Sequence, residues 1–599
     1  MVLSWIDWTV LAATLLTIVG YGTWVTRNNK TAQDYIKGGN TTRWWTIGLS
    51  VMATQASAIT FLSTTGQAFS EGMGFVQFYF GLPIAMVIIC LVFIPLYHRL
   101  KVYTAYEFLE NRFDLKTRSL TAILFLIQRG LAAGITIFAP AIILSIVLGI
   151  NIVYLNIIIG FLVIIYTVSG GTKAVTVTQK QQMFVIFAGM LAALFITLQL
   201  IPNEISFNDA LEIAGANGRM EILDFSFDLE NRYTVWSGLI GGTFLALSYF
   251  GTDQSQVQRY LSGSNVKNMQ MGLIFNGLLK VPMQFFILLC GIMVFVFYQF
   301  NPSPLNFIDA STQTVLVSEY GDDYRSLQEK QNILFNKKKD LSLLLAKNDS
   351  PELIQEISAL DSIEKTYRLK SKFLIKKAVD KEYTSEYNTL ESEVASLKSS
   401  PKSEDYIAKS HELKTLYASA AKDTRTNDRD YMFIRFILNQ LPVGLIGLLL
   451  AVILSAAMSS TASEINALAT ITSIDLYGRN VKGKKDDAVM VRVTKWFTLA
   501  WGIVAIIIAC FANLAENLIQ LVNIIGSIFY GNVLGIFLLA FFFKRIKGNA
   551  VFVGALITQI IIIAGWWFNW MPYLWLNLFG CVLVILITNL IQGYTKNTD

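Results

Sequence analysis

The feature that most constrains the fold of this chain is a series of apolar stretches, each about twenty residues long, that runs through most of its length. A helix of that length and composition can cross the hydrocarbon core of a bilayer. Of the 599 residues, 54% are hydrophobic and 15% are charged. A soluble domain carries about 25% charged residues. The sequence therefore predicts an all-α polytopic membrane protein.

Length and apolar content predict about thirteen transmembrane spans. Their expected positions are 5–26, 44–68, 75–98, 118–149, 151–168, 179–201, 235–257, 271–300, 433–473, 490–512, 517–543, 549–568 and 572–593. Lys and Arg gather in alternate loops, whereas the intervening loop 202–234 is acidic. By the positive-inside rule, a multi-pass protein of the cell membrane with its amino terminus outside and its carboxyl terminus in the cytoplasm is expected.

One long segment, 301–432, interrupts the spans and is rich in Lys, Glu and Ser. Leu and Ile recur in it at helical spacing, so we expect a charged extracytoplasmic helical hairpin or short coiled coil. It is either a lineage-specific insertion or a docking element for an unknown partner. The expected domains are a first transmembrane helix with its cytoplasmic loop (1–43), a first part of the core (44–300), the insertion (301–432), a second part of the core (433–543) and the C-terminal helices (544–599).

A run of small and hydroxyl residues, 456–464, lies inside one span. On a helix, Ala456, Ser459, Ser460 and Ser463 share one face. Hydroxyl and carbonyl oxygens that converge at bilayer depth can replace the water shell of a small hard cation. The alternative is close helix packing, because small residues let transmembrane backbones approach each other.

The second span is also unusual, because residues 50–66 are rich in small and hydroxyl side chains and include Gln55 at mid-depth. Such a segment is a poor continuous lipid-facing helix. An unwound helix is tolerated at membrane depth where it lines a cavity, and its freed carbonyls can bind Na⁺. Packing against neighbouring helices is the alternative.

Two basic residues, Lys280 and Arg129, lie well inside apolar spans. Charged groups at this depth are costly and are candidates for function. Each either contacts a polar substrate or belongs to a structural ion pair, and Glu464 is one possible partner.

Several motifs together resemble those of the sodium:solute symporter family in their order and spacing. They are 34–39, 53–65, 103–113, 169–171 and 456–466. The resemblance covers the chain except 301–432 and implies an inverted-repeat core of five plus five helices with a broken first core helix. It also implies one Na⁺ as the coupling ion. The implied ligands are the carbonyls of Ala53, Ala56 and Ala456 and the hydroxyls of Ser459 and Ser460.

Some members of the family hold a second sodium with an aspartate in the fifth core helix. Gln179 stands at that position here, and Ala462 replaces a hydroxyl. We therefore expect a single sodium.

The resemblance also implies solute contacts. Lys280, Tyr249 and Asn523 match residues of the sugar-carrying branch, whereas Ala246 replaces its sugar-binding asparagine. The loop 103–113 looks more like the monocarboxylate and vitamin branch, and Arg129 favours an anionic solute. The candidate substrate-binding residues are Gln55, Ser57, Thr60, Arg129, Tyr249, Lys280 and Asn523.

The sequence therefore predicts a sodium-coupled symporter that imports a sugar, sugar acid or monocarboxylate by alternating access. The alternatives are a sodium-independent uniporter or channel, and a transporter-like solute sensor. A sensor needs an output domain, and few residues follow the last span. The sequence contains no nucleotide-binding glycine loop, metal cluster or nucleophile–base pair, so neither an enzyme nor a nucleic-acid partner is expected.

Overall fold

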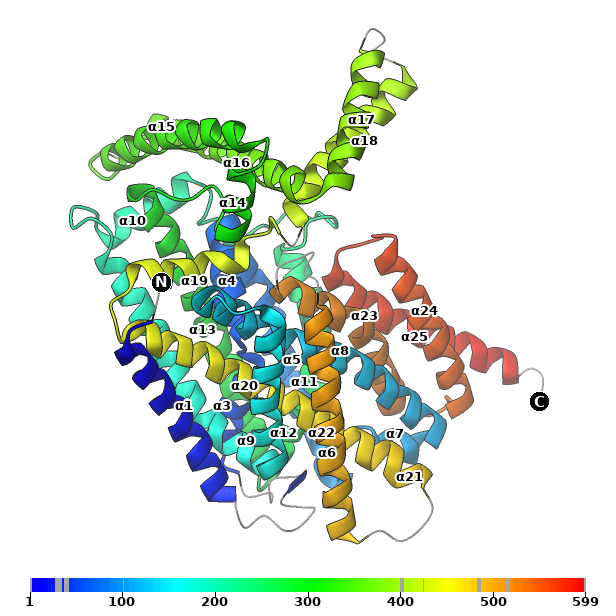
Figure 1. Ribbon diagram of the computed structural model, residues 1–599. Coiled ribbons are helices and arrows are strands. Elements are labelled where there is room, and N and C mark those ends of the chain that lie inside the picture. The colour runs from blue at the N-terminus through cyan, green and yellow to red at the C-terminus, as the bar shows by residue number, and fades with distance from the viewer. Residues whose placement is uncertain are drawn as a thin grey trace.

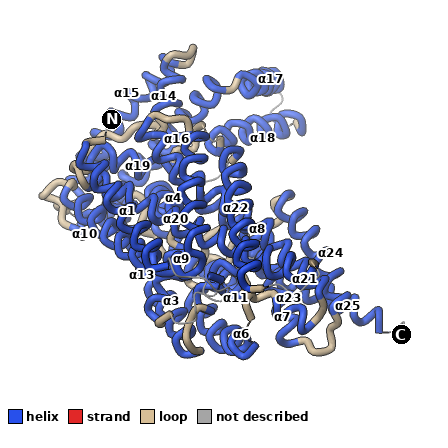
Figure 2. The backbone as a smooth tube through the Cα atoms, turned by 60° about the horizontal axis from the view of Figure 1, so that its bottom comes forward, coloured by secondary structure: helices blue, strands red, loops and turns tan. Residues whose placement is uncertain are grey.

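The computed structural model describes residues 3–26, 35–36, 42–100, 102–348, 350–398, 403–423, 425–481, 486–512 and 518–596. Within these ranges the backbone consists of helices and loops (Figure 2), and an isolated β-bridge joins Thr42 to Gly263. Most of the 34–39 motif lies outside the described residues.

Across the described ranges, nine helices are long and apolar enough to cross a membrane. A tenth crossing is a bent pair of helices, α3 (Trp44–Gln55) and α4 (Ala58–Glu71). Three shorter apolar segments are Trp5–Ile18, Ile152–Ile165 and Ser237–Gly251. Together these segments lie at the thirteen expected positions, so the all-α polytopic fold is confirmed.

The first half of the core consists of five spans. They are α3 with α4; η2 (Met73–Tyr79), α5 (Gly81–Ile88), η3 (Ile89–Phe93) and α6 (Ile94–Leu100); α8 (Leu115–Leu148); and the two parts of α9 (Ile152–Gln199). The two parts of α9 meet at Gly171, where φ is 58° and ψ is −155°. A side chain is disfavoured there because φ is positive. A Cβ would also lie 2.5 Å from the Tyr35 carbonyl oxygen.

The second half repeats this arrangement with five more spans. They are η4 (Ser237–Gly241), α11 (Gly242–Gly251) and α12 (Gln254–Leu261); α13 (Val266–Phe300); α20 (Leu445–Ile471) with η6 (Thr472–Tyr477) and α21 (Gly478–Asn480); α22 (Asp487–Phe511); and α23 (Leu518–Phe542). The first span of each half is broken, as the five-plus-five core requires. Outside this core lie α1 (Trp5–Thr26), α7 (Glu107–Arg112), α10 (Phe207–Ala216), α24 (Gly548–Trp567) and α25 (Tyr573–Lys596).

Two expected spans are not continuous. The span 235–257 ends as a helix at Gly251 and resumes at Gln254. The span 433–473 comprises two helices, α19 (Arg429–Gln440) and α20. They are separate because Pro442 has no amide hydrogen to donate and Gly444 adopts a φ of 89°. These corrections move helix boundaries and leave the topology unchanged.

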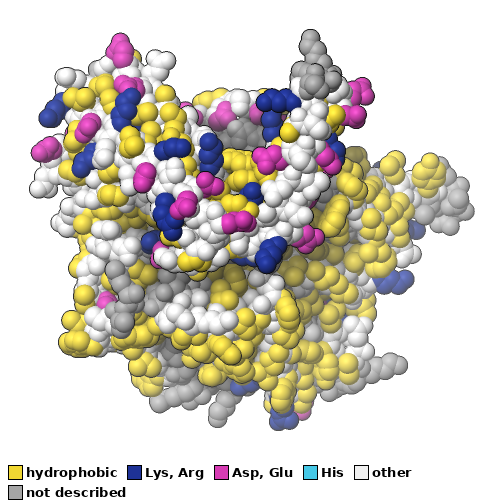
Figure 3. All heavy atoms as spheres, turned by 45° about the horizontal axis from the view of Figure 1, so that its top comes forward, with side chains coloured by type: hydrophobic (Ala, Val, Ile, Leu, Met, Phe, Trp, Pro, Cys, Tyr) yellow, Lys and Arg dark blue, Asp and Glu magenta, His cyan; other side chains and the backbone are white. Residues whose placement is uncertain are grey.

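Residues 301–428 form a separate layer over one end of the bundle. Its helices are α14 (Asp309–Leu316), α15 (Gly321–Leu345), α16 (Pro351–Val379), α17 (Lys381–Leu397), α18 (Glu404–Ser419) and η5 (Ala420–Lys422). Figure 1 shows this layer on the side where α1 begins, with α15 beside α16 and α17 beside α18. In Figure 3 acidic and basic side chains are mixed over this layer, while apolar side chains dominate the bundle below it.

Ion pairs attach this layer to the bundle. Lys338 on α15 lies 2.8 Å from Glu364 and 3.4 Å from Asp361, both on α16. Asp361 in turn lies 3.5 Å from Arg219, whose Nε donates to the carbonyl of Phe69 at the end of α4. Burial alone would raise the pKa of Glu364, but the charges of Lys338 and Arg368 lower it to about 2.

Candidate functional site

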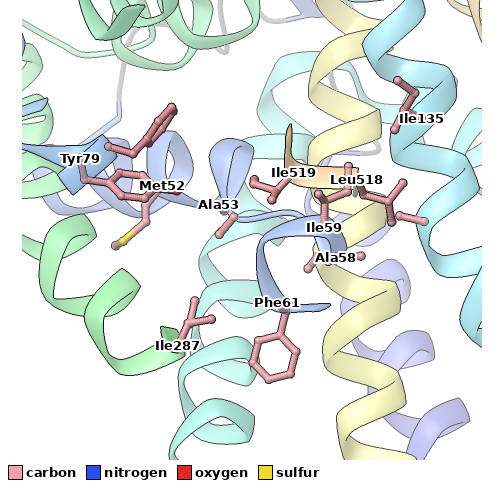
Figure 4. Close-up of a cluster of buried hydrophobic side chains, with 14 of the residues drawn as sticks. Met52, Ala53, Ala58, Ile59, Phe61, Tyr79, Ile135, Ile287, Leu518 and Ile519 are labelled. Carbon is pink, nitrogen blue, oxygen red and sulfur yellow. The ribbon is translucent and has the colours of Figure 1, made fainter. Parts of the chain in front are cut away.

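The centre of the site is the break between α3 and α4, where the helix axis bends by 62°. Met52 still accepts a hydrogen bond from Ala56 N at 2.7 Å, and Ser57 N donates to the Gln55 carbonyl at 3.1 Å. In Figure 4 Ala53 and Ala58 lie on the two arms of this break, beside Leu518 and Ile519 of α23. Neither proline nor glycine lies between Met52 and Thr65. Packing against neighbouring helices therefore holds the break open.

Two of the predicted sodium ligands, Ser459 and Ala53, are in contact across this break. Ser459 Oγ on α20 donates to the carbonyl of Ala53 at 3.1 Å. Ser460 is buried, and its hydroxyl has no hydrogen-bond partner among the described residues. Ala456 lies one turn earlier on the same helix. Oxygen is the ligand atom that small hard cations prefer, and an unpaired buried hydroxyl fits such a ligand set.

Beside this position, Gln179 of α9 bonds to oxygens of two other helices. Its Nε2 donates to Thr54 Oγ1 at 2.9 Å and to Ser463 Oγ at 2.8 Å. Its Oε1 accepts from Ser50 Oγ at 2.5 Å. Thr54 and Ser463 thus share a neutral amide nitrogen as their donor. In other members of the family, the resemblance implies that an aspartate at the position of Gln179 helps to hold a second sodium.

A cavity of about 80 Å³ adjoins the break. The helices that line it are α3, α4, α8, α11, α20 and α23, together with η2. Six of the seven candidate substrate-binding residues line it, namely Gln55, Ser57, Thr60, Arg129, Tyr249 and Asn523. Ser460 of the predicted sodium site lines it as well. Residues far apart in sequence therefore line one cavity.

Arg129 lies in the cavity wall as the centre of a buried ion cluster. Its guanidinium donates to Glu464 Oε1 at 3.0 Å, to Tyr530 Oη at 2.5 Å and to Asp253 Oδ2. Tyr530 also donates to Asp253, at 3.1 Å. The guanidinium carbon lies 5.3 Å from the ring centroid of Tyr249. The ion pair with Glu464, which the sequence left open as an alternative, is thus present.

Lys280 is buried in α13 but does not line the cavity. Its Nζ has no hydrogen-bond partner in the described part of the chain and lies 5.9 Å from the ring centroid of Tyr79. Tyr79 itself lines the cavity.

Sequence reasoning missed two residues of this site. Asp253 lies at the second break, where its Oδ1 accepts from Ser255 N at 2.9 Å and from Ser255 Oγ at 2.6 Å. An acidic residue followed by Gln-Ser-Gln inside an apolar span was the available signal. Tyr530 carried no comparable signal, because aromatic residues are common in transmembrane spans.

Two broken helices that enclose a polar cavity within an inverted-repeat bundle define a secondary-transporter fold. A sequence model of the sodium:solute symporter family matches residues 35–316 and 412–560. The chain belongs to this family.

The human sodium/iodide cotransporter is 33% identical over 297 residues, which are 49% of this chain and 45% of that protein. Mouse sodium-coupled monocarboxylate transporter 2 is 31% identical over 273 residues (45% and 44%). The sodium/glucose cotransporter of Vibrio parahaemolyticus is 29% identical over 304 residues (49% and 56%). The chain thus spans about half the length of the curated relatives it matches.

The solved structure of a substrate-bound, outward-open Na⁺-coupled sialic acid symporter superposes on this chain with a TM-score of 0.72. The alignment covers 99% of this chain and 98% of that one, at 20% sequence identity. The two proteins share a fold over their whole lengths.

Proposed function

We propose that this protein is a sodium-coupled symporter that imports a small polar organic solute by alternating access. The observation that carries the proposal is the contact between Ser459 Oγ and the Ala53 carbonyl across the helix break, next to a cavity lined by both broken spans. A sodium ion held there would join α3 to α20. It would couple to the solute by binding one conformation of the bundle more tightly than the other. The membrane potential contributes about 2.3 kcal/mol per positive charge per 100 mV.

The proposed solute is a sugar, a sugar acid or a monocarboxylate. Polar side chains and tyrosine rings line the cavity together, which suits a solute with both polar groups and an apolar face. Two of the relatives are named for glucose and for monocarboxylates.

The test is uptake by the full chain in proteoliposomes with an imposed sodium gradient. Replacing both hydroxyls in Ser459→Ala/Ser460→Ala is expected to raise the sodium concentration for half-maximal uptake at least about tenfold. Thr461→Ala is the matched control, because this buried threonine lies on the same helix but does not line the cavity. An unchanged sodium dependence in the double variant would remove the proposed sodium site.

Solute flux that does not depend on the sodium gradient would instead support a uniporter or channel. Solute binding without flux would support a sensor.

We also propose that the insertion and the start of α1 face the outside of the cell. The start of α1 lies on the insertion side, where Asp7 accepts from Gly444 N at 2.7 Å. The far end of α25 lies near the loop after α23, where Gln592 accepts from Lys547 N at 2.8 Å.

A further inference from the structure

Five buried polar atoms in the wall of the cavity have no hydrogen-bond partner among the described residues. They are Gln55 Oε1, Arg129 Nε, Ser460 Oγ, Glu464 Oε2 and Asn523 Nδ2. An unsatisfied buried polar group costs about 1–3 kcal/mol, so these atoms are positions where a bound molecule gains hydrogen bonds. An amide oxygen and a carboxylate oxygen only accept hydrogen bonds, a hydroxyl does both, and the Asn523 amide nitrogen and the Arg129 Nε donate.

Glu464 is the anionic member of this set. Its Oε1 accepts from Arg129, but its Oε2 remains free. Thr136 on α8 lies beside the carboxylate, yet its hydroxyl donates to the carbonyl of Ala132 at 3.0 Å. The free oxygen belongs to a side chain that is 5% exposed and lines the cavity.

The charges around this oxygen do not attract an anion. Arg129 carries one positive charge but contacts two carboxylates, those of Asp253 and Glu464, so the cluster is net negative. Lys280, whose Nζ has no hydrogen-bond partner in the described part of the chain, does not line the cavity. An anionic solute would therefore meet a free carboxylate oxygen in a setting where like charges repel strongly.

We propose that Glu464 determines the specificity of this site. Its free oxygen accepts a hydrogen bond from a hydroxyl or ammonium group of the solute and excludes solutes that present a carboxylate there. The inference rests on the proposed transport function and narrows its solute to a neutral, hydroxyl-bearing or ammonium-bearing molecule. The cavity of about 80 Å³ corresponds to roughly five to eight water molecules, which sets the scale of a small polar solute.

The experiment compares matched probes that differ only in charge. One set is galactose, galacturonate and galactosamine, and a smaller set is 1,2-propanediol, lactate and 1-amino-2-propanol. Each is tested for thermal stabilisation of the purified full chain in sodium and in choline, and then for sodium-driven uptake into proteoliposomes. For the wild type, we compare the concentrations at which the members of one set give half-maximal stabilisation or uptake. In at least one set, this concentration is expected to be at least about tenfold lower for the neutral or ammonium member than for the carboxylate.

Glu464→Gln is expected to reduce this preference at least about tenfold by removing the charge while keeping the side chain's shape. Glu356→Gln makes the same substitution at a surface ion pair and should leave the preference unchanged. Asp253→Asn removes a charge from the cluster without altering a cavity-lining oxygen, and it should change the preference less than Glu464→Gln does.

A wild type that prefers the carboxylate members, or responds to none of the six probes, overturns the proposal without any variant having to fold. An unchanged preference in Glu464→Gln overturns it as well. Responses that need no sodium contradict the proposed symport instead, while the order of the probes still decides the role of Glu464.

Discussion

Removing the Arg129 side chain gives the most direct test of what holds the centre of this bundle together. Arg129→Gln keeps a polar side chain but takes the charge away from two buried carboxylates, Asp253 and Glu464. Both side chains are more than nine-tenths buried, so hydration replaces the lost partner only in part. We therefore expect a large loss of stability as well as a loss of transport.

The magnitude follows from the geometry. Breaking a buried ion pair by removing one partner costs about 3–5 kcal/mol, and Arg129 is the partner of two acids. At about 2.1 cal/mol/K of unfolding entropy per residue, a chain of 599 residues shifts its midpoint by about 0.8 °C per kcal/mol, so this corresponds to roughly 2–4 °C. The assay is thermal unfolding of the purified full chain in detergent, in the absence of solute.

A second substitution separates charge from packing. Arg129→Gln/Glu464→Gln removes one of the two stranded charges, while Asp253 keeps its hydrogen bonds from Ser255 and Tyr530. The double variant should recover about 1–3 kcal/mol relative to Arg129→Gln alone. Arg325→Gln is the control, because its ion pair with Asp322 is exposed and should change stability by less than about 1 kcal/mol.

The reasoning is refuted if Arg129→Gln unfolds within about 1 °C of the wild type, a shift worth less than the loss of one buried pair. If that variant kept its stability but lost affinity for an anionic solute, Arg129 would contact the solute directly, as the sequence alone suggested.

Three further predictions concern other parts of the molecule. Gln179→Leu should lower stability by about 1–3 kcal/mol in thermal unfolding, because it leaves the hydroxyls of Ser50, Thr54 and Ser463 without their amide partner; an unchanged midpoint would contradict the network. Gly66→Ala should cost about 1–3 kcal/mol and slow uptake, because its Cβ would lie 2.1 Å from the Arg429 carbonyl oxygen; Gly20→Ala, with no atom within 4 Å of its Cβ, is the control. Glu364→Gln should loosen the insertion by about 3–5 kcal/mol, seen as faster amide hydrogen exchange in α15 and α16, because it leaves Lys338 and Arg368 short of a partner. Since the pKa of Glu364 is lowered from 4.5 to about 2, its contribution is complete above about pH 4.5 and is lost as the pH falls toward 2. The protection that Glu364 gives to α15 and α16 against exchange should therefore stay constant between pH 5 and 8, and a loss of protection within that range would contradict this assignment.

The number of spans and the first helix break could be predicted because both depend on local composition. Apolar length fixes the spans, and the small, hydroxyl-rich stretch from Ser50 onward signals an irregular helix. The second break lies at a polar stretch, Thr252 to Gln256, at the end of an apolar span, where it is equally typical of a loop that follows the span. Pro442 and Gly444 indicate the boundary between α19 and α20. The apolar residues on both sides of them nevertheless favoured a single continuous span in the sequence.

The partners of the buried charges could be predicted only in part. Glu464 is separated from Arg129 by 335 residues, and Asp253 by 124. Only the tertiary fold decides which acid reaches the guanidinium. The accessibility of Lys280 likewise depends on where the Tyr79 ring lies, which no local pattern determines.

The outer arm of the broken helix, α4, is joined to α19 in two ways. Arg429 lies 2.7 Å from Glu71, and the absence of a side chain at Gly66 lets the two backbones touch. Movement of α4 alone would break both contacts, so α4 and α19 are expected to move as one rigid unit. We therefore expect the bending between this unit and α3 during the proposed alternating access to occur at Ala56 and Ser57, where the helix axis already bends by 62°. Such a pivot is two residues long and includes a predicted sodium ligand, so sodium binding would bear directly on access from the insertion side.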